Sequence, residues 1–277
     1  MNIKKMKYKK DFTIYYKAEN PSQVLIDKAI FYLKNYHNGN SSELVKKDNG
    51  REIFKTTVAS KSYYFKKYSY RSFDKKLKSL FRNSPAFRAF KVSKELISKG
   101  VPVVEPVLVV EYKITPITID SIYVSKDFRG DNLQEFLAYA DYSIKEKNEI
   151  IMKLSKYWVK LYKNNYINGD PNLPGVLLKY NDDWQLSFVD VDNFKKLIYL
   201  SKRRIIRNLA KFNAHSYSGL DKLDGKKLNH EDRKLFLHYI LKLYKNRDFN
   251  NIDQNIKNET LNILKKWDKD NLFKRCN

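Results

Sequence analysis

The sequence contains almost no cysteine: Cys276 is the only one among 277 residues. A single thiol excludes an internal disulfide and a thiolate metal site, and it fits a reducing compartment. Long apolar runs are also missing, since no stretch approaches the roughly 20 apolar residues of a membrane-spanning helix. The first residues are basic, and no apolar run follows them. We therefore expect a cytoplasmic protein that touches the inner face of a membrane only from the side.

Acidic residues are scarce relative to basic ones. The chain has 31 Asp and Glu against 55 Lys and Arg, a formal net charge of +24. This charge predicts attraction to anionic partners such as nucleotides, phosphorylated glycans, membrane surfaces or nucleic acid. The excess of Lys, Asn, Ile and Tyr is also typical of AT-rich genomes, so part of the charge need not serve binding. A hydrophobic content of 42% allows one large core or two lobes that share a cleft.

The first part of the chain has strand and turn signals. Residues 48–50 (DNG) form a turn signal, and the β-branched and aromatic residues that follow, up to Phe65, predict a hairpin. Ser84 suits a helix N-cap and Pro85 the first helical position, so we predict a helix from there to Gly100. Residues 101–112 and 121–124 are further strand candidates.

The second part of the chain is mainly helical in pattern. Apolar residues recur at helical spacing in 133–140, 151–161, 236–243 and 261–267. A loop at 168–172 contains Asp170, and a predicted strand at 184–191 ends on Asp190. Segregated strands and helices predict an α+β fold with two lobes. We expect a small antiparallel-sheet lobe plus one helix at 1–126 and a larger, mainly helical lobe at 127–277.

These elements occur in the order that a phosphoryl-transfer site requires. Such a site needs a cation near the nucleotide phosphates, a carboxylate that orients the attacking hydroxyl, and a second carboxylate for magnesium. Along the chain come Lys66 at a strand end, the helix after Ser84, a hinge at 126–128, a helix around Trp158, and then Asp170 and Asp190.

Six segments make this order more specific. They are YFKKY at 64–68, LFRNSPAFRAF at 80–90, GVPVVEP at 100–106, INGDP at 167–171, FVDVD at 188–192 and SKRRIIRNLA at 201–210. Together they resemble the lipopolysaccharide core kinases of the Kdo/WaaP family, over roughly residues 60–212. The resemblance implies a two-lobed protein-kinase-like fold, ATP and magnesium as cofactors, and phosphorylation of a heptose or Kdo residue in the lipopolysaccharide inner core.

The same resemblance implies a role for individual residues. Lys66 would bind the nucleotide phosphates, Asp170 would be the catalytic base and Asp190 would bind magnesium. Asn172 is a candidate for a further magnesium ligand, because an amide oxygen is a suitable hard donor. We expect Lys66, Asp170 and Asp190 to converge around one magnesium-bound triphosphate.

Some positions depart from the protein-kinase pattern, which has His two residues before the catalytic Asp and Asn five residues after it. This chain has Asn168 and Gly175 there. Ala89 stands where the family often carries a Glu that pairs with the Lys. No glycine-rich nucleotide loop is visible, and Asn49-Gly50 is the only candidate. A catalytically inactive pseudokinase scaffold therefore remains an alternative.

A dense basic run follows the second Asp. Arg203, Arg204 and Arg207 lie on a predicted helix, where guanidinium groups suit the phosphates or carboxylates of an acidic glycan acceptor. A solvated helix face is the alternative reading. A second basic cluster, in residues 75–82, suits an anionic lipid surface. The expected partners are therefore the lipopolysaccharide core glycan, or a related anionic glycolipid, and an anionic membrane.

Nucleic-acid binding is a third possibility, supported by the net charge and the 21 Tyr residues. No zinc-binding pattern, helix-turn-helix spacing or RNP-like string accompanies them, so we expect no nucleic-acid partner. The four histidines are scattered without ligand spacing, and we interpret them as incidental. They are His37, His215, His230 and His238.

Overall fold

The computed structural model describes residues 3–17, 21–34, 43–48, 50–69, 83–115, 118–225, 228–244 and 251–275. The chain divides into two compact units, one made of residues 1–95 and 104–128 and the other of residues 96–103 and 129–277. His37, Asn49, the basic cluster at 75–82 and Cys276 lie outside the described residues.

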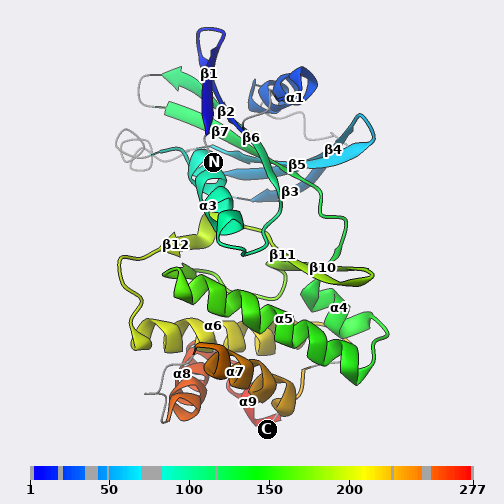
Figure 1. The fold of residues 1–277 in the computed structure, drawn as a ribbon, viewed down its shortest axis with the longest axis vertical. Helices are drawn as coiled ribbons and strands as arrows, with labels where there is room; N and C mark the ends of the chain where they lie inside the picture. Colours follow the sequence, from blue (N-terminus) through cyan, green and yellow to red (C-terminus); the bar gives the residue numbers. More distant parts are fainter. Residues whose placement is uncertain are drawn as a thin grey trace. The chain divides into compact units, whose positions relative to one another are not determined.

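The first unit is built on a seven-stranded antiparallel sheet with the order β1-β2-β6-β7-β5-β4-β3 (Figure 1). Its strands are β1 (Lys4–Tyr8), β2 (Phe12–Tyr16), β3 (Leu44–Asp48), β4 (Arg51–Val58), β5 (Lys61–Tyr68), β6 (Pro106–Thr115) and β7 (Thr118–Lys126). Asp48 of β3 pairs with Arg51 of β4, as the predicted hairpin requires, and Gly50 has a left-handed φ of 80°. A second tight turn, at Ala59 and Ser60, joins β4 to β5 with both residues at positive φ.

The two faces of this sheet hold different helices. Alternate strand residues such as Phe65, Leu108 and Val124 share a buried core with helix α1 (Gln23–Lys34). On the other face, Tyr123 hydrogen-bonds Ser93 of helix α3 (Pro85–Ser98) at 3.1 Å. Side chains alternate between the faces because the strand repeat is two residues.

The two helices of the first unit differ in how well the sequence predicted them. The Ser84 hydroxyl accepts the Phe87 N–H at 3.1 Å, so the predicted N-cap of α3 is confirmed. Helix α1 is one helix more than we predicted for this part of the chain. Its signals were present, since Ser22 precedes it and Leu25, Ile26, Ala29, Ile30 and Leu33 have helical spacing and are buried.

The second unit is mainly helical (Figure 1). Its helices are α4 (Leu133–Tyr139), α5 (Ile144–Lys163), α6 (Lys202–Leu220), α7 (His230–Tyr244), α8 (Ile252–Lys266) and α9 (Asn271–Arg275). Trp158 of α5 is fully buried, and its ring lies 4.5 Å from Phe212 of α6 and 5.9 Å from Phe236 of α7. This aromatic cluster joins three helices in one core.

Two small sheets carry the loops of the second unit. One contains β8 (Asp131–Asn132), β10 (Val176–Asn181) and β11 (Asp183–Phe188), and the other pairs β9 (Tyr166–Asn168) with β12 (Phe194–Lys196). The loop with Asp170 connects β9 to β10. The loop with Asp190 leads from β11 through a short 3-10 turn, η1 (Val191–Asn193), to β12. In the described parts of the chain, each helix is too short or too polar to cross a membrane.

Candidate functional site

The loop after β9 holds Asp170 through local hydrogen bonds. Asn168 Oδ1 accepts the backbone N–H of Asp170 at 3.0 Å. Asn172 donates its amide to the Asp170 carbonyl at 3.2 Å, and its Oδ1 accepts the Gly175 N–H at 2.8 Å. Short polar side chains that bond the backbone two or three residues away stabilise turns. The Asp170 side chain remains 46% exposed, so its carboxylate can meet a ligand.

A buried chain of polar groups connects this loop to the helices behind it. Asn208 of α6 donates its amide to the Asn168 carbonyl at 2.6 Å. Its own oxygen accepts the Tyr162 hydroxyl at 3.0 Å, and that hydroxyl accepts the Trp158 indole N–H at 3.1 Å. Burial raises the pKa of Tyr162, so the hydroxyl stays protonated and can donate. The position of the loop therefore depends on α5 and α6.

Two further side chains of α6 reach Asp170 itself. Lys211 Nζ donates to the Gly169 carbonyl at 2.8 Å and lies 3.3 Å from Asp170 Oδ1. His215 Nε2 lies 3.6 Å from the same oxygen. Asn208, Lys211 and His215 are spaced at i, i+3 and i+7, which places them on one face of the helix.

His215 was interpreted from sequence as incidental, and the structure places it near Asp170, where its buried Nε2 makes no hydrogen bond with the described residues. Burial lowers the pKa of His215, the Lys211 charge lowers it further, and the Asp170 carboxylate opposes both effects. Its ring also packs against Trp267, with centroids 4.8 Å apart. Lys211 was not among the predicted residues at all. The helical spacing was readable, but which face of α6 meets the loop is a tertiary property.

The loops of Asp170 and Asp190 are joined through Asn193. The Asn193 N–H donates to the Asp190 carbonyl at 3.1 Å, and the Asn193 carbonyl accepts the Gly169 N–H at 2.8 Å. A Cβ on Gly169 would lie 2.9 Å from that carbonyl, so this approach requires glycine. Asp190 itself has a left-handed backbone, with φ 53° and ψ 40°, and lies beyond the end of β11 rather than in the strand.

The oxygen atoms on these two loops suit magnesium. Mg²⁺ prefers hard oxygen ligands and commonly takes only one or two carboxylates, with substrate phosphates completing its shell. Asp170 and Asp190 supply carboxylates of this type. Asn172 Oδ1 already accepts one N–H and keeps one lone pair. In the described ranges, no three acidic, His or Cys side chains gather into a ready-made metal site.

Lys66 belongs to the first unit, and the next residue, Lys67, lies on the opposite face of the sheet. Lys66 pairs in register with Tyr123, so it lies on the sheet face that carries α3. Lys67 points to the opposite face, where it is only 1% exposed. There its Nζ donates to the Tyr32 carbonyl at 2.7 Å and lies 3.3 Å from the Glu52 carboxylate. Lys67 therefore has a structural role.

The predicted acceptor-binding arginines lie in the first turns of α6 and are exposed. At 100° per residue, Arg204 and Arg207 lie within about 40° of Lys211 around the helix axis, whereas Arg203 lies about 80° away. Arg207 Nε is 3.6 Å from Glu259 and its side chain remains 56% exposed. Arg204 and Arg207 thus extend the helix face that carries Lys211.

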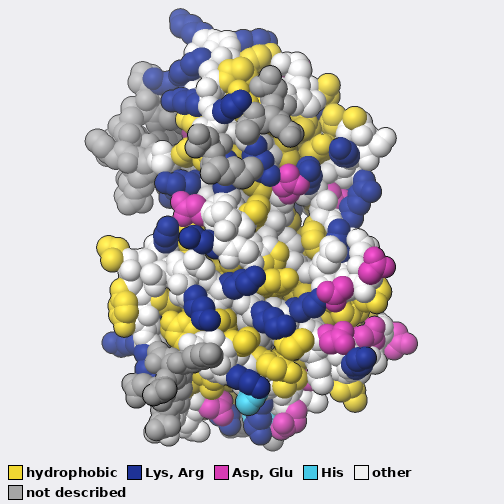
Figure 2. Space-filling model, viewed as in Figure 1, with side chains coloured by type: hydrophobic (Ala, Val, Ile, Leu, Met, Phe, Trp, Pro, Cys, Tyr) yellow, Lys and Arg dark blue, Asp and Glu magenta, His cyan; other side chains and the backbone are white. Residues whose placement is uncertain are grey.

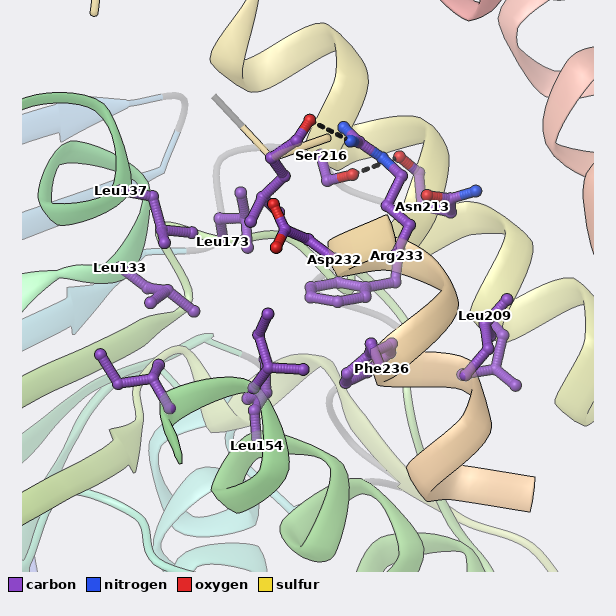
Figure 3. A pocket seen from close by; sticks show the side chains of 15 residues that line it. Leu133, Leu137, Leu154, Leu173, Leu209, Asn213, Ser216, Asp232, Arg233 and Phe236 are labelled. Carbon is purple, nitrogen blue, oxygen red and sulfur yellow. Dashed lines mark hydrogen bonds between the residues drawn. The ribbon is translucent and has the colours of Figure 1, made fainter. Parts of the chain in front are cut away.

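An apolar cavity of about 40 Å³ lies among α4, α5, α6 and α7 in the second unit. Figure 3 shows leucine side chains from several of these elements around it. Asp232 and Arg233 also line it, but Asp232 pairs with Lys147 at 2.8 Å and Arg233 stacks on the Tyr217 ring at 3.8 Å. Neither Asp170 nor Asp190 lines the cavity, so we interpret it as a gap in core packing.

Comparisons with known proteins agree with this architecture. A protein-family model, the lipopolysaccharide kinase (Kdo/WaaP) family, matches residues 33–237. Among 920 matching chains of solved structures is "WaaP in complex with acyl carrier protein", with a TM-score of 0.58 and 16% identity over 80% of this chain and 89% of that one. The predicted α+β, protein-kinase-like fold is thereby confirmed. Curated proteins give no match.

Proposed function

Since the chain belongs to the lipopolysaccharide kinase (Kdo/WaaP) family, we propose that it transfers the terminal phosphoryl group of ATP to a sugar hydroxyl of the lipopolysaccharide inner core, on a heptose or Kdo residue. The observation that carries the proposal is the setting of Asp170. Its half-exposed carboxylate lies 3.3 Å from Lys211, in a loop hydrogen-bonded to the loop of Asp190.

Asp170 orients the acceptor hydroxyl in this proposal and accepts its proton. An ionised carboxylate has about four lone-pair sites. Lys211 and Asn172, at 3.3 Å and 3.4 Å, occupy two of them, so the acceptor hydroxyl can use another. Lys211 also orients this carboxylate by donating to its Oδ1.

The remaining predicted residues bind the anionic ligands. Lys66 contacts the nucleotide phosphates, and Asp190 with Asn172 would hold magnesium, which neutralises charge on the phosphates when bound. Arg204 and Arg207 bind the acidic groups of the acceptor, because they lie on the helix face that leads to Lys211 and present guanidinium forks.

The structure of the loop bears on the pseudokinase alternative. Asn168 and Gly175, which depart from the protein-kinase pattern, each make a hydrogen bond that shapes the loop around Asp170. These residues thus belong to a different but organised loop. This organisation supports an active enzyme over an inactive scaffold.

The test is phosphate transfer from labelled ATP to deacylated core oligosaccharide. Asp170→Asn keeps the shape of the side chain and removes the base, so we expect transfer to fall at least about 100-fold. Because Asp170 is half-exposed, thermal unfolding should stay close to wild type. Glu231→Gln is a matched control on a carboxylate that is 76% exposed. Full activity in Asp170→Asn would refute the assignment of Asp170, and an inactive wild type would favour the pseudokinase.

A further inference from the structure

Two apolar side chains project from the segment that links β12 to α6. Ile198 is fully exposed, at 103%, and Tyr199 is 73% exposed. The residues on either side are held: Leu200 is buried, and the Leu197 N–H donates to the Asn165 carbonyl at 2.8 Å. Ile198 and Tyr199 therefore form an apolar tip on an anchored base, which we call the 198–199 tip.

The exposure of this tip stands out within the described parts of the chain. Ile198 is the most exposed large hydrophobic side chain there. Single exposed apolar residues are ordinary, but an adjacent pair with fixed flanks keeps its apolar surface in water at a cost. Figure 1 shows the link from β12 to α6 at the left edge of the second unit, and Figure 2 shows hydrophobic side chains at that edge.

Basic residues border the tip on both sides. Lys195 and Lys196 precede it, and Lys202, Arg203 and Arg204 follow it in the first turn of α6. Four of the five are exposed and Lys202 is partly so. The sequence has no Asp or Glu from residue 193 to residue 220. The sequence around the tip is therefore strongly basic.

We propose that the segment 195–204 docks the protein on an anionic phospholipid membrane. Ile198 and Tyr199 enter the interfacial layer of the bilayer, and the Lys and Arg side chains bind the phosphate groups of the lipids. Tyrosine suits this layer because its ring is apolar and its hydroxyl stays wet. Stable membrane attachment usually takes two weak signals, and a short apolar insertion beside a basic patch supplies both.

The composition of the tip favours lipid over a protein partner. A specific protein interface buries on the order of 1,000 Å² or more, which two side chains cannot provide. Headgroups instead offer a continuous anionic layer over an apolar interior, which matches a basic border around an apolar point.

The inference deepens the proposed function, on which its biological purpose rests. The docking segment begins within β12, and β12 pairs with β9, the strand that leads to Asp170. Docking would bring the Asp170 loop close to the surface in which a lipid-linked sugar acceptor is embedded.

The experiment is co-sedimentation of the full chain with vesicles of phosphatidylcholine alone or mixed with phosphatidylglycerol. The test variant is Ile198→Ser/Tyr199→Ser. The chain offers a matched control, Tyr139→Ser/Ile144→Ser, which removes an equally apolar pair that is 61% and 75% exposed near the α4–α5 connection. We expect the test variant to lose about tenfold or more in affinity for the mixed vesicles, and the control to bind as wild type does.

Several results would overturn the proposal. The first is that the test variant binds the mixed vesicles as well as wild type does, or that the control variant loses as much affinity as the test variant. The second is that wild type binds vesicles of phosphatidylcholine alone as tightly as the mixed vesicles. The third is that the tip causes self-association of the protein and no binding to vesicles. The assay contains neither nucleotide nor acceptor, so an inactive enzyme would not alter it. Conversely, the test variant should phosphorylate a soluble, deacylated acceptor at the wild-type rate if the kinase assignment is right.

Discussion

Asn208 offers a direct way to perturb the Asp170 loop from the helical core. Its side chain is 7% exposed and bridges the Asn168 carbonyl and the Tyr162 hydroxyl. Asn208→Leu keeps a side chain of four heavy atoms branched at Cγ, but it leaves both groups without this partner. Each unsatisfied buried polar group costs about 1–3 kcal/mol, so we expect the free energy of unfolding to fall by about 3 kcal/mol. Transfer activity should fall as well, because Asn168 positions the backbone of Asp170.

A second variant separates the two hydrogen bonds of Asn208. Tyr162→Phe removes the hydroxyl and leaves the bond from Asn208 to the Asn168 carbonyl in place. It should therefore lower stability while sparing most of the activity. Because Asn208→Leu and Tyr162→Phe remove one shared bond, the double variant should be less destabilised than the sum of the two, with a coupling energy of about 1 kcal/mol.

The assay for this pair is urea unfolding followed by circular dichroism, together with transfer kinetics under native conditions. Asn208→Asp is the informative control, since it can still accept from Tyr162 but cannot donate to Asn168. Its activity should resemble that of Asn208→Leu. The reasoning fails if Asn208→Leu unfolds within about 0.5 kcal/mol of wild type, or if the two single variants add without coupling.

Two further predictions concern other titratable residues. Lys66→Ala should abolish transfer. Lys67→Met should lower the free energy of unfolding by about 3 kcal/mol, because the largely buried Glu52 carboxylate loses a buried partner. Urea unfolding and transfer assays on both variants would expose a reversed assignment. Because burial lowers the pKa of His215 below its ordinary 6.5, the unfolded chain binds that proton more readily, so stability is full above pH 6.5 and is lost on acidification. His215→Phe, which can keep packing on Trp267, should flatten this loss in urea titrations at several pH values, and an unchanged slope would contradict the role of His215.

Much of the fold was predictable because its signals are local. Strand-forming residues located β4 and β5, and helical periodicity located α4, α5, α7 and α8; the Ser84 cap set the start of α3. The turn at Ala59 and Ser60 escaped prediction, since neither residue is a usual choice for positive φ and the paired strands impose it. Asp190 was expected at a strand end, but its loop bends into a left-handed turn that bonds to Asn193.

In the candidate site, too, the sequence determined some features and the tertiary structure determined others. The sequence by itself determined the charged residues and their order, because the segments around Lys66, Asp170 and Asp190 are contiguous strings whose chemistry can be read directly. Only the tertiary structure decided which face of α6 meets the Asp170 loop, and so brought Lys211 and His215 to its carboxylate from more than 40 residues away. Contacts of that kind depend on how a helix is rotated in its core, and helical spacing alone leaves that rotation open.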